Sequence, residues 1–392
     1  MAQINAFSFT MPTSLRFGCG VLDELAKNPL PGKRLMIVTG GNSVKRYGTL
    51  DRILEMTAKK TESVFVFDGV PQNPTRECVM EGTRFARENG VDVVIGVGGG
   101  SSMDAAKGIA MMATNEGDLW DYVQIGTGKR LPFARPRLPL ILIPTTAGTG
   151  SEGNKTAVIT NSETKEKVGV RTDFPSAAYV DPELTLSVPA RFTALQGYDA
   201  FCHLMEAFVS VKATMISDAW AVQGMRELLT WLPKAVANGD DIEARTHVMY
   251  AASLGGIVIG ISSCSSAHTL EHALSGINPK VEHGAGLAMV ADAFHGTVAK
   301  NAPRRYAEAA ELLGIVTDGM SDPEKAETLN RKSREMREAC GIGELRLRNY
   351  GFTSADIDAL VEMTHVVAGG PLSRDRYLMT DDELAAVFEE SL

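Results

Sequence analysis

Short apolar runs alternate with stretches of helical length through the first half of the chain. The runs that predict strands are residues 35–39, 63–67, 91–97, 138–144 and 178–181. Helical patterns cover residues 44–58, 75–89 and 103–113. Apolar strands separated by helices are typical of βαβ units, so this half predicts a parallel sheet covered by helices.

The pattern changes after Val188-Pro189. Two further short strands are expected before it, at residues 156–160 and 167–170, and from Thr193 onward helical periodicity replaces alternation. We therefore expect an α/β domain over residues 1–188 and an all-helical domain over residues 189–392. The predicted helices of the second domain are residues 193–211, 217–237, 245–261, 267–275, 284–298, 304–313, 323–340, 354–366 and 381–390.

Composition narrows the functional classes. A net charge of −9 disfavours a broad nucleic-acid-binding surface. The five cysteines are dispersed with no C-x-x-C pair, which is typical of a reducing compartment. The uncharged stretch 248–267 has only about 14 apolar positions before a run of serines, which is short for a bilayer span. With no secretory signal pattern at the start, these features predict a cytoplasmic protein with no membrane or nucleic-acid partner.

Two glycine-rich loops follow predicted strands. The first, Gly96-Val-Gly-Gly-Gly-Ser-Ser-Met-Asp-Ala-Ala-Lys107, opens a predicted helix, and the second is Ile143-Pro-Thr-Thr-Ala-Gly-Thr-Gly-Ser-Glu152. Glycines let the backbone approach a ligand, and a helix start presents unpaired N–H groups to an anion. The first loop has Ser101 where G-x-G-x-x-G has its third glycine, so a plain strand-to-helix turn is the alternative. Two such loops at the carboxyl ends of parallel strands favour a phosphate-bearing ligand.

A carboxylate and several histidines have the spacing of metal ligands. Asp199 and His203 are four residues apart and project from one helix face, and His268 and His272 repeat that spacing. His283 follows shortly after. An Asp/His pair alone is more often an ordinary helix-surface contact, but the histidine cluster favours a borderline divalent ion such as Fe²⁺ or Zn²⁺.

Together these segments resemble the iron-containing (type III) alcohol dehydrogenase family, whose motifs occur in the same order. The matching segments are Asn73-Pro-Thr75, Gly98-Gly-Gly-Ser-x-x-Asp104-x-x-Lys107, Pro144-Thr-Thr-Ala-Gly-Thr-Gly-Ser-Glu152, Asp199-x-x-x-His203, His268-x-x-x-His272 and His283-Gly. Two positions depart from the pattern. Gly153-Asn154 stands where many members have Val-Thr, and Thr156 stands where relatives often have Asn.

The resemblance implies a Rossmann-like dinucleotide-binding domain (1–188) and a helical metal-binding domain (189–392) in a dehydroquinate synthase-like architecture, with the active site in the cleft between them. It implies the metal ligands Asp199, His203, His268 and His283, and a pocket role for His272 near substrate and nicotinamide. We expect His272 to relay the alcohol proton, with packing as its alternative role. The implied cofactor contacts are Asn73, Gly99, Gly100, Ser101, Asp104, Thr145, Thr146, Thr149 and Lys167.

The implied activity is metal-dependent interconversion of a primary or secondary alcohol and its aldehyde or ketone. Four protein ligands usually close a zinc site, whereas the larger coordination number of Fe²⁺ leaves room for the substrate oxygen. The ion would act as a Lewis acid while hydride passes to or from NAD(P). Alternatives on this fold are glycerol dehydrogenase-like polyol oxidation, a maleylacetate reductase-like or dehydroquinate synthase-like activity, and, from another class, a non-catalytic nucleotide-binding protein. The intact ligand set disfavours the maleylacetate reductase and the non-catalytic protein.

The loop after the first predicted strand favours NADP(H) over NAD(H). Relatives that prefer NAD often carry Asp directly after this strand, where Gly40 here removes both bulk and negative charge. Asn42 and Ser43 can donate hydrogen bonds, and Lys45 and Arg46 add positive potential. A plain glycine-rich turn that admits both cofactors is the alternative.

A strand-like apolar segment at residues 4–10 precedes the predicted sheet. In relatives this edge pairs between subunits. We therefore expect a homodimer or a larger assembly built from dimers.

Overall fold

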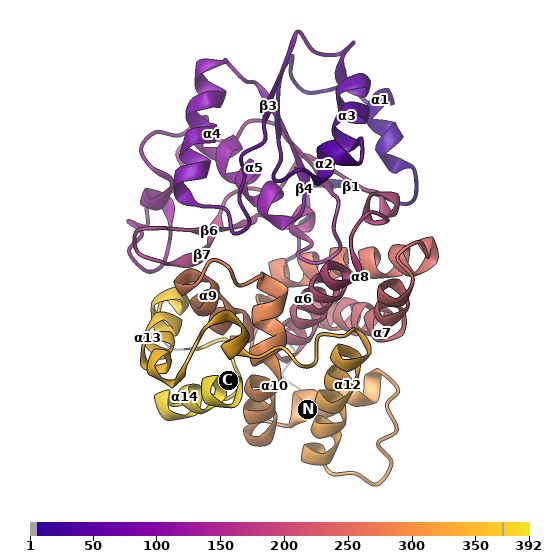
Figure 1. The fold of residues 1–392 in the computed structure, drawn as a ribbon, viewed down its shortest axis with the longest axis vertical. Helices are drawn as coiled ribbons and strands as arrows, with labels where there is room; N and C mark the ends of the chain where they lie inside the picture. The colour runs from indigo at the N-terminus through magenta and orange to yellow at the C-terminus, as the bar shows by residue number, and fades with distance from the viewer. Residues whose placement is uncertain (1–5, 371) are drawn as a thin grey trace. The chain divides into compact units, whose positions relative to one another are not determined.

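The computed structural model describes residues 6–370 and 372–392. These residues form two compact units, one of residues 10–188 and one of residues 189–392 together with residues 6–9 (Figure 1). The sequence places residues 6–9 with the α/β domain, and the structure differs there. The Phe9 ring packs edge-on against Trp220 of the helical unit, with ring centroids 5.4 Å apart.

A six-stranded sheet, in which all neighbouring strands are parallel, forms the centre of the 10–188 unit. Its strands, in spatial order, are β1 (Ser14–Phe17), β8 (Ala177–Val180), β5 (Leu140–Pro144), β4 (Val93–Gly98), β2 (Arg34–Val38) and β3 (Ser63–Phe67). The five apolar runs of the sequence account for five of these strands, and the predicted parallel sheet is confirmed. The sixth, β1, is a half-buried edge strand of four residues, which is too short to give a clear pattern.

Helices cover this sheet as the βαβ pattern predicts (Figure 1). They are α1 (Glu24–Lys27), α2 (Ser43–Arg46), α3 (Thr49–Thr57), α4 (Arg76–Glu88) and α5 (Gly100–Met112). The helix expected over residues 44–58 is broken into α2 and α3, because Gly48 adopts a left-handed φ of 73° between them. An antiparallel hairpin of β6 (Thr156–Thr160) and β7 (Lys167–Arg171) completes the unit.

The sheet order positions the two glycine-rich loops. β4 pairs with β2 on one side and with β5 on the other. The chain leaves β2 for β3 in one direction across the sheet and leaves β4 for β5 in the opposite direction, so a switch point lies between β2 and β4. Such a switch point is where open α/β sheets bind ligands, at the carboxyl ends of the strands. The loops that follow β4 and β5 therefore begin side by side, and Thr145 donates a backbone hydrogen bond to the Gly98 carbonyl at 2.9 Å.

The second unit is helical, as predicted. Its helices are α6 (Ala190–Val209), α7 (Met215–Ala237), α8 (Ile242–Ser262), α9 (Ala267–Ile277), α10 (His283–Asn301), α11 (Arg304–Leu312), α12 (Asp322–Ala339), α13 (Ile357–Ala368) and α14 (Asp381–Glu390). Fully buried aromatic side chains such as Phe201, Phe208, Phe294 and Phe388 form much of its core. Helices packed around aromatic side chains provide a stable frame for any side chain that points inward.

The described helices and the first described residues test two expectations, the absence of a membrane span and a strand over residues 4–10. Among the described helices, none is by itself long and apolar enough to cross a bilayer; α8 and α9 pass that test only as a pair, and they are bent by 103° at their junction. Of the strand expected over residues 4–10, residues 4 and 5 lie outside the described residues. Residues 6–10 form no strand in this structure.

Candidate metal centre

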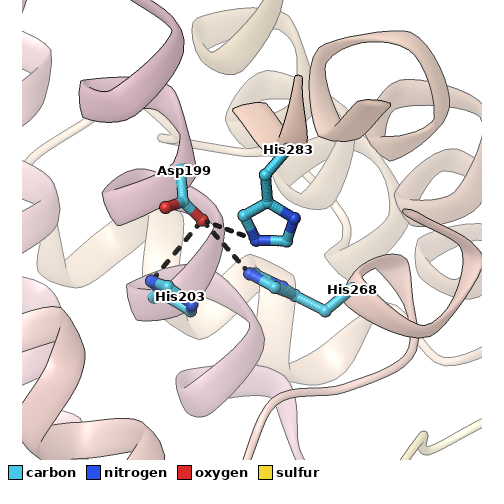
Figure 2. A group of neighbouring side chains, drawn as sticks. All are labelled: Asp199, His203, His268 and His283. Atoms are coloured by element: carbon cyan, nitrogen blue, oxygen red, sulfur yellow. Dashed lines mark hydrogen bonds and ion pairs between the residues drawn. The ribbon is translucent and has the colours of Figure 1, made fainter. Parts of the chain in front are cut away.

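Three helices bring together the four side chains that the sequence singles out as metal ligands. Asp199 and His203 lie one turn apart on α6, His268 lies in the first turn of α9, and His283 is the first residue of α10. Figure 2 shows all four converging, with the Asp199 carboxylate at the centre of the three imidazoles. Asp199, His203 and His268 are buried and His283 is partly buried.

The spacing of the donor atoms fits a shared ion. Asp199 Oδ1 lies 3.7 Å from His203 Nδ1, 3.3 Å from His268 Nε2 and 3.4 Å from His283 Nε2. These separations are long for direct hydrogen bonds. Ligand atoms about 2.1 Å from one ion lie about 3.4 Å apart in a tetrahedral arrangement. One carboxylate and three imidazoles, with all four donor atoms within 4.8 Å of one another, therefore suit a divalent transition metal.

The electrostatics of the cluster favour a cation. Burial on its own would raise the pKa of Asp199, but His203, His283 and His268 hold that pKa well below its usual value. Burial would likewise lower the pKa of His268, but Glu206, Cys264 and Asp199 raise it well above the usual value. Positive charge is thus stabilised where the imidazoles face Asp199, even without an ion.

Two buried glutamates contact the far sides of two of the imidazoles. Glu206 Oε1 accepts a hydrogen bond from His268 Nδ1 at 2.6 Å, and Glu271 Oε2 accepts a short one from His283 Nδ1. Both glutamate side chains are fully buried. Neither glutamate is among the residues that the sequence motifs predict, although Glu206 continues the helix face of Asp199 and His203 and Glu271 directly precedes His272.

His272 lies beside this cluster. It is on α9, one turn after His268, and its ring centroid is 5.8 Å from that of His283. Its side chain is 16% exposed, and its Nε2 lies 4.0 Å from Glu271 Oε2. His272 is therefore a neighbour of the metal cluster that retains access to solvent.

In the other unit, the two glycine-rich loops touch one another. A Cβ added to Gly100 would lie 2.5 Å from Thr149 Cγ2, and one added to Gly99 would lie 3.3 Å from Thr146 Oγ1. Glycine at position 100 thus lets the two loops approach this closely, and position 99 leaves little room for a side chain. The candidate residues Ser101, Thr145, Thr146 and Thr149 are partly exposed along the edge that the loops form.

A buried lysine ties these loops together. Lys107 on α5 donates to Ser151 Oγ at 2.6 Å, to the Thr156 carbonyl at 2.7 Å and to Asn154 Oδ1 at 3.3 Å. Asp104 accepts from Ser151 Oγ at 2.5 Å and from the Val158 amide at 2.8 Å. Burial lowers the pKa of Lys107 to about 8, against the opposing effects of Asp104 and Glu152. Asn154, a departure from the family pattern, is part of this network.

The remaining candidate cofactor residues are a buried pair, two exposed residues and Gly40. Asn73 and Lys167 are buried and paired, with Lys167 Nζ donating to Asn73 Oδ1 at 3.0 Å. Asn42, in the loop after β2, and Ser43, the first residue of α2, are exposed. A Cβ added to Gly40 would lie 2.4 Å from the Val70 carbonyl oxygen, so packing alone requires glycine at this position.

The comparisons with known proteins agree over nearly the whole chain. The model of the family "Iron-containing alcohol dehydrogenase" matches residues 12–182, and that of "Fe-containing alcohol dehydrogenase family, C-terminal" matches residues 193–391. The chain is 32% identical to 1,3-propanediol dehydrogenase of Citrobacter freundii, covering 98% of both chains, and 32% identical to NAD-dependent methanol dehydrogenase of Bacillus methanolicus, covering 91% and 92%. Its fold matches an alcohol dehydrogenase of a halo-thermophilic Red Sea brine pool archaeon with a TM-score of 0.93, 28% identity and full coverage of both chains.

Proposed function

This chain belongs to the iron-containing alcohol dehydrogenase family and is an oxidoreductase that interconverts alcohols and carbonyl compounds, and from that premise we propose how its own residues do so. Asp199, His203, His268 and His283 hold the metal, with Fe²⁺ as the native ion and Zn²⁺ as an alternative occupant. The observation that carries this assignment is the convergence of the four donor atoms within 4.8 Å.

When bound, the ion supplies Lewis acidity toward an alcohol or carbonyl oxygen, and the nicotinamide accepts or gives the hydride. The protein supplies position and charge. Asp199 provides the single negative charge among the four ligands and the three imidazoles are neutral donors, so a divalent ion keeps a net positive charge here. The edge formed by Gly99, Gly100 and Ser101 with Thr145, Thr146 and Thr149 offers N–H and O–H donors to the cofactor pyrophosphate. Asp104 and Lys107 hold the two loops together, and Asn73 and Lys167 support a further cofactor contact.

The substrate is a primary or secondary alcohol or its carbonyl partner. Relatives named for 1,3-propanediol, methanol and long-chain alcohols support this class while differing in chain length. A panel of alcohols and aldehydes of increasing length, assayed with iron-loaded and zinc-loaded protein, tests the proposal. Turnover of at least one member that depends on the metal supports it, and metal-independent turnover contradicts it.

His272 relays the alcohol proton in this proposal. The His272→Ala variant should keep its metal, because His272 is outside the four-ligand set, yet turn over more slowly wherever proton transfer limits the rate. General acid–base groups contribute roughly a hundredfold to ten-thousandfold. The measurement is the pH–rate profile between about pH 6 and 10, with metal content determined in parallel. An unchanged profile, with only a lowered melting temperature, would assign His272 to packing. His365→Ala is a control, since that exposed histidine pairs with Asp381 away from the cluster.

The enzyme prefers NADPH to NADH in this proposal. Lys45 lies in α2, the helix that follows β2, and Asp68 directly follows the neighbouring strand β3; the two side chains form an exposed ion pair. A 2′-phosphate would compete with Asp68 for Lys45 and add a charge-assisted hydrogen bond of about 1.5–3 kcal/mol, or roughly tenfold to a hundredfold in affinity. We expect kcat/KM with one aldehyde to be higher for NADPH by that factor.

Variants of the ion pair test this preference better than a substitution of Gly40, where packing leaves no room for a side chain. Lys45→Ala should reduce the preference for NADPH, and Asp68→Asn should increase it by releasing Lys45. Lys59→Ala, an exposed lysine of the same unit, serves as the control. A wild-type preference for NADH, or no change in the Lys45→Ala variant, contradicts the proposal.

We also propose a homodimer, or an assembly built from dimers, in the cytoplasm. β1 is an edge strand of the sheet with β8 as its neighbour on one side, and an open edge is suited to pairing with a second copy. All five cysteines are free thiols, which fits a reducing compartment. Light scattering should give a multiple of the 42.0 kDa chain mass. A single species at the chain mass contradicts the dimer.

A further inference from the structure

The two glutamates behind the metal cluster link its helices in a defined order. Glu206 of α6 binds His268 of α9, and Glu271 of α9 binds His283 of α10. The third imidazole, His203, is instead carried by the same helix as Asp199, one turn away. The two histidines that come from other helices are therefore the two that a buried carboxylate holds.

Each of these hydrogen bonds fixes which nitrogen faces the ion. With Nδ1 donating to the glutamate, a neutral imidazole keeps its Nε2 lone pair for the metal. The Nε2 atoms of His268 and His283 are the ones that face Asp199, at 3.3 and 3.4 Å. A carboxylate on the far nitrogen also makes an imidazole a more basic ligand.

The backbone of α10 is shaped to admit one of these glutamates. A Cβ added to Gly286 would lie 2.7 Å from Glu271 Cγ and 3.3 Å from Glu271 Oε1. A Cβ added to Gly284 would lie 2.2 Å from the Leu195 carbonyl oxygen, so that glycine lets α10 approach α6. The segment His283-Gly-Ala-Gly286 thus contains a ligand, a glycine for helix packing and a glycine that makes room for the carboxylate behind the ligand.

The burial of both glutamates needs a compensating charge. Each side chain is fully buried, and an ionised carboxylate is costly to bury unless it is paired. With a divalent ion bound, the ligand set carries one net positive charge. The imidazole rings of His268 and His283 lie between that charge and the two glutamates. The two buried carboxylates behind the imidazoles therefore favour a bound cation at this site over an empty or apolar pocket.

We propose that Glu206 and Glu271 are positioning residues that orient His268 and His283 and set the metal affinity of the centre. This inference rests on the proposed ligand set. Removing such a partner typically lowers metal affinity by about tenfold to a hundredfold. We expect that loss for Glu206→Ala and for Glu271→Ala, with a smaller loss for the glutamine variants, whose amide oxygen can still accept from Nδ1.

The experiment measures metal binding and not turnover. Co²⁺ is titrated into metal-free protein, and its visible absorption reports both the dissociation constant and the ligand geometry. Glu227→Gln is the matched control, because Glu227 also accepts from a histidine, His247 Nδ1 at 2.8 Å, but outside the cluster. Circular dichroism establishes that each variant is folded, and each glutamate has two variants in case alanine prevents folding.

A substitution of Gly286 gives an independent test of the same proposal. Gly286→Ala should displace Glu271 and weaken Co²⁺ binding by a similar factor, but add little in the Glu271→Ala background, because the group it displaces is then absent. Wild-type Co²⁺ affinity in all folded glutamate variants overturns the inference while leaving the ligand set intact. Failure of the wild-type protein to bind Co²⁺ overturns the ligand set as well.

Discussion

Replacing His283 with alanine is expected to remove most of the bound metal and to lower turnover by several orders of magnitude. The substitution removes one of four donors and also leaves Glu271 buried without the imidazole that binds it. The Lewis acid and its ligand shell are then lost together. His268→Ala should behave in the same way, since Glu206 then loses the imidazole that binds it.

Elemental analysis and steady-state rates, measured on the same samples, test this expectation. Because zinc binds such sites more tightly than iron, protein loaded with each metal under anaerobic conditions should be compared. His247→Ala is the control, since that histidine stacks on Trp231 and binds Glu227 outside the cluster. Full activity in a metal-free preparation would show that these residues do not carry the chemistry.

The second large effect is expected from Lys107→Met. The substitution removes three hydrogen bonds and leaves Asp104 buried without its cation. Removing one partner of a buried pair typically costs about 3–5 kcal/mol. The 10–188 unit should therefore lose stability, and cofactor affinity should fall because α5, the loop around Ser151 and β6 are no longer tied together. Metal content should not change, since all four proposed ligands belong to the other unit.

Hydrogen exchange of the amides in α5 and β6 measures this loss within one unit of a two-unit chain. The effect should also depend on pH. The folded pKa of Lys107 is about 8, below its usual value of 10.5, so the unfolded chain binds more protons between these values. The wild-type protein should then gain stability relative to the variant as pH rises through that window. Lys59→Met is the control, and unchanged protection of α5 in Lys107→Met would contradict the expectation.

The fold was predictable from the sequence where burial is continuous. β2, β4, β5 and β8 are apolar runs of four to six residues that are mostly buried, and their pattern is unambiguous. The edge strand β3 is only half-buried, but four of its five residues are apolar, so it was predicted as well. β1 was missed because its four residues, Ser-Leu-Arg-Phe, include two polar ones and form no apolar run. The start of α5 at Gly100 was missed because glycine has low helix propensity, and the contact with Thr149 requires it there. The helix propensity of a residue does not reflect a packing requirement that comes from a neighbouring loop.

The residues of the candidate site were likewise predictable only in part. Ligands that share a helix face, such as Asp199 and His203, can be recognised from their spacing in the sequence. Glu206 and Glu271 do not, because a hydrogen bond between helices has no signature in one chain. Gly40 shows the converse: its lack of charge suggested a role in cofactor choice, whereas the Val70 carbonyl already demands a glycine.

Residues 6–9 belong to the helical unit, and this has a consequence for how the chain folds. The helical unit is discontinuous in sequence, so the 10–188 unit is an insertion near its start. On the ribosome this inserted unit emerges before residues 189–392 and can fold before they are made. Its two ends are adjacent strands, with Ser14 of β1 paired with Ala177 of β8. Once its sheet has formed, the ends of the insertion are already held together, and the entropy of closing so long a loop is no longer an obstacle to docking Phe9 on Trp220.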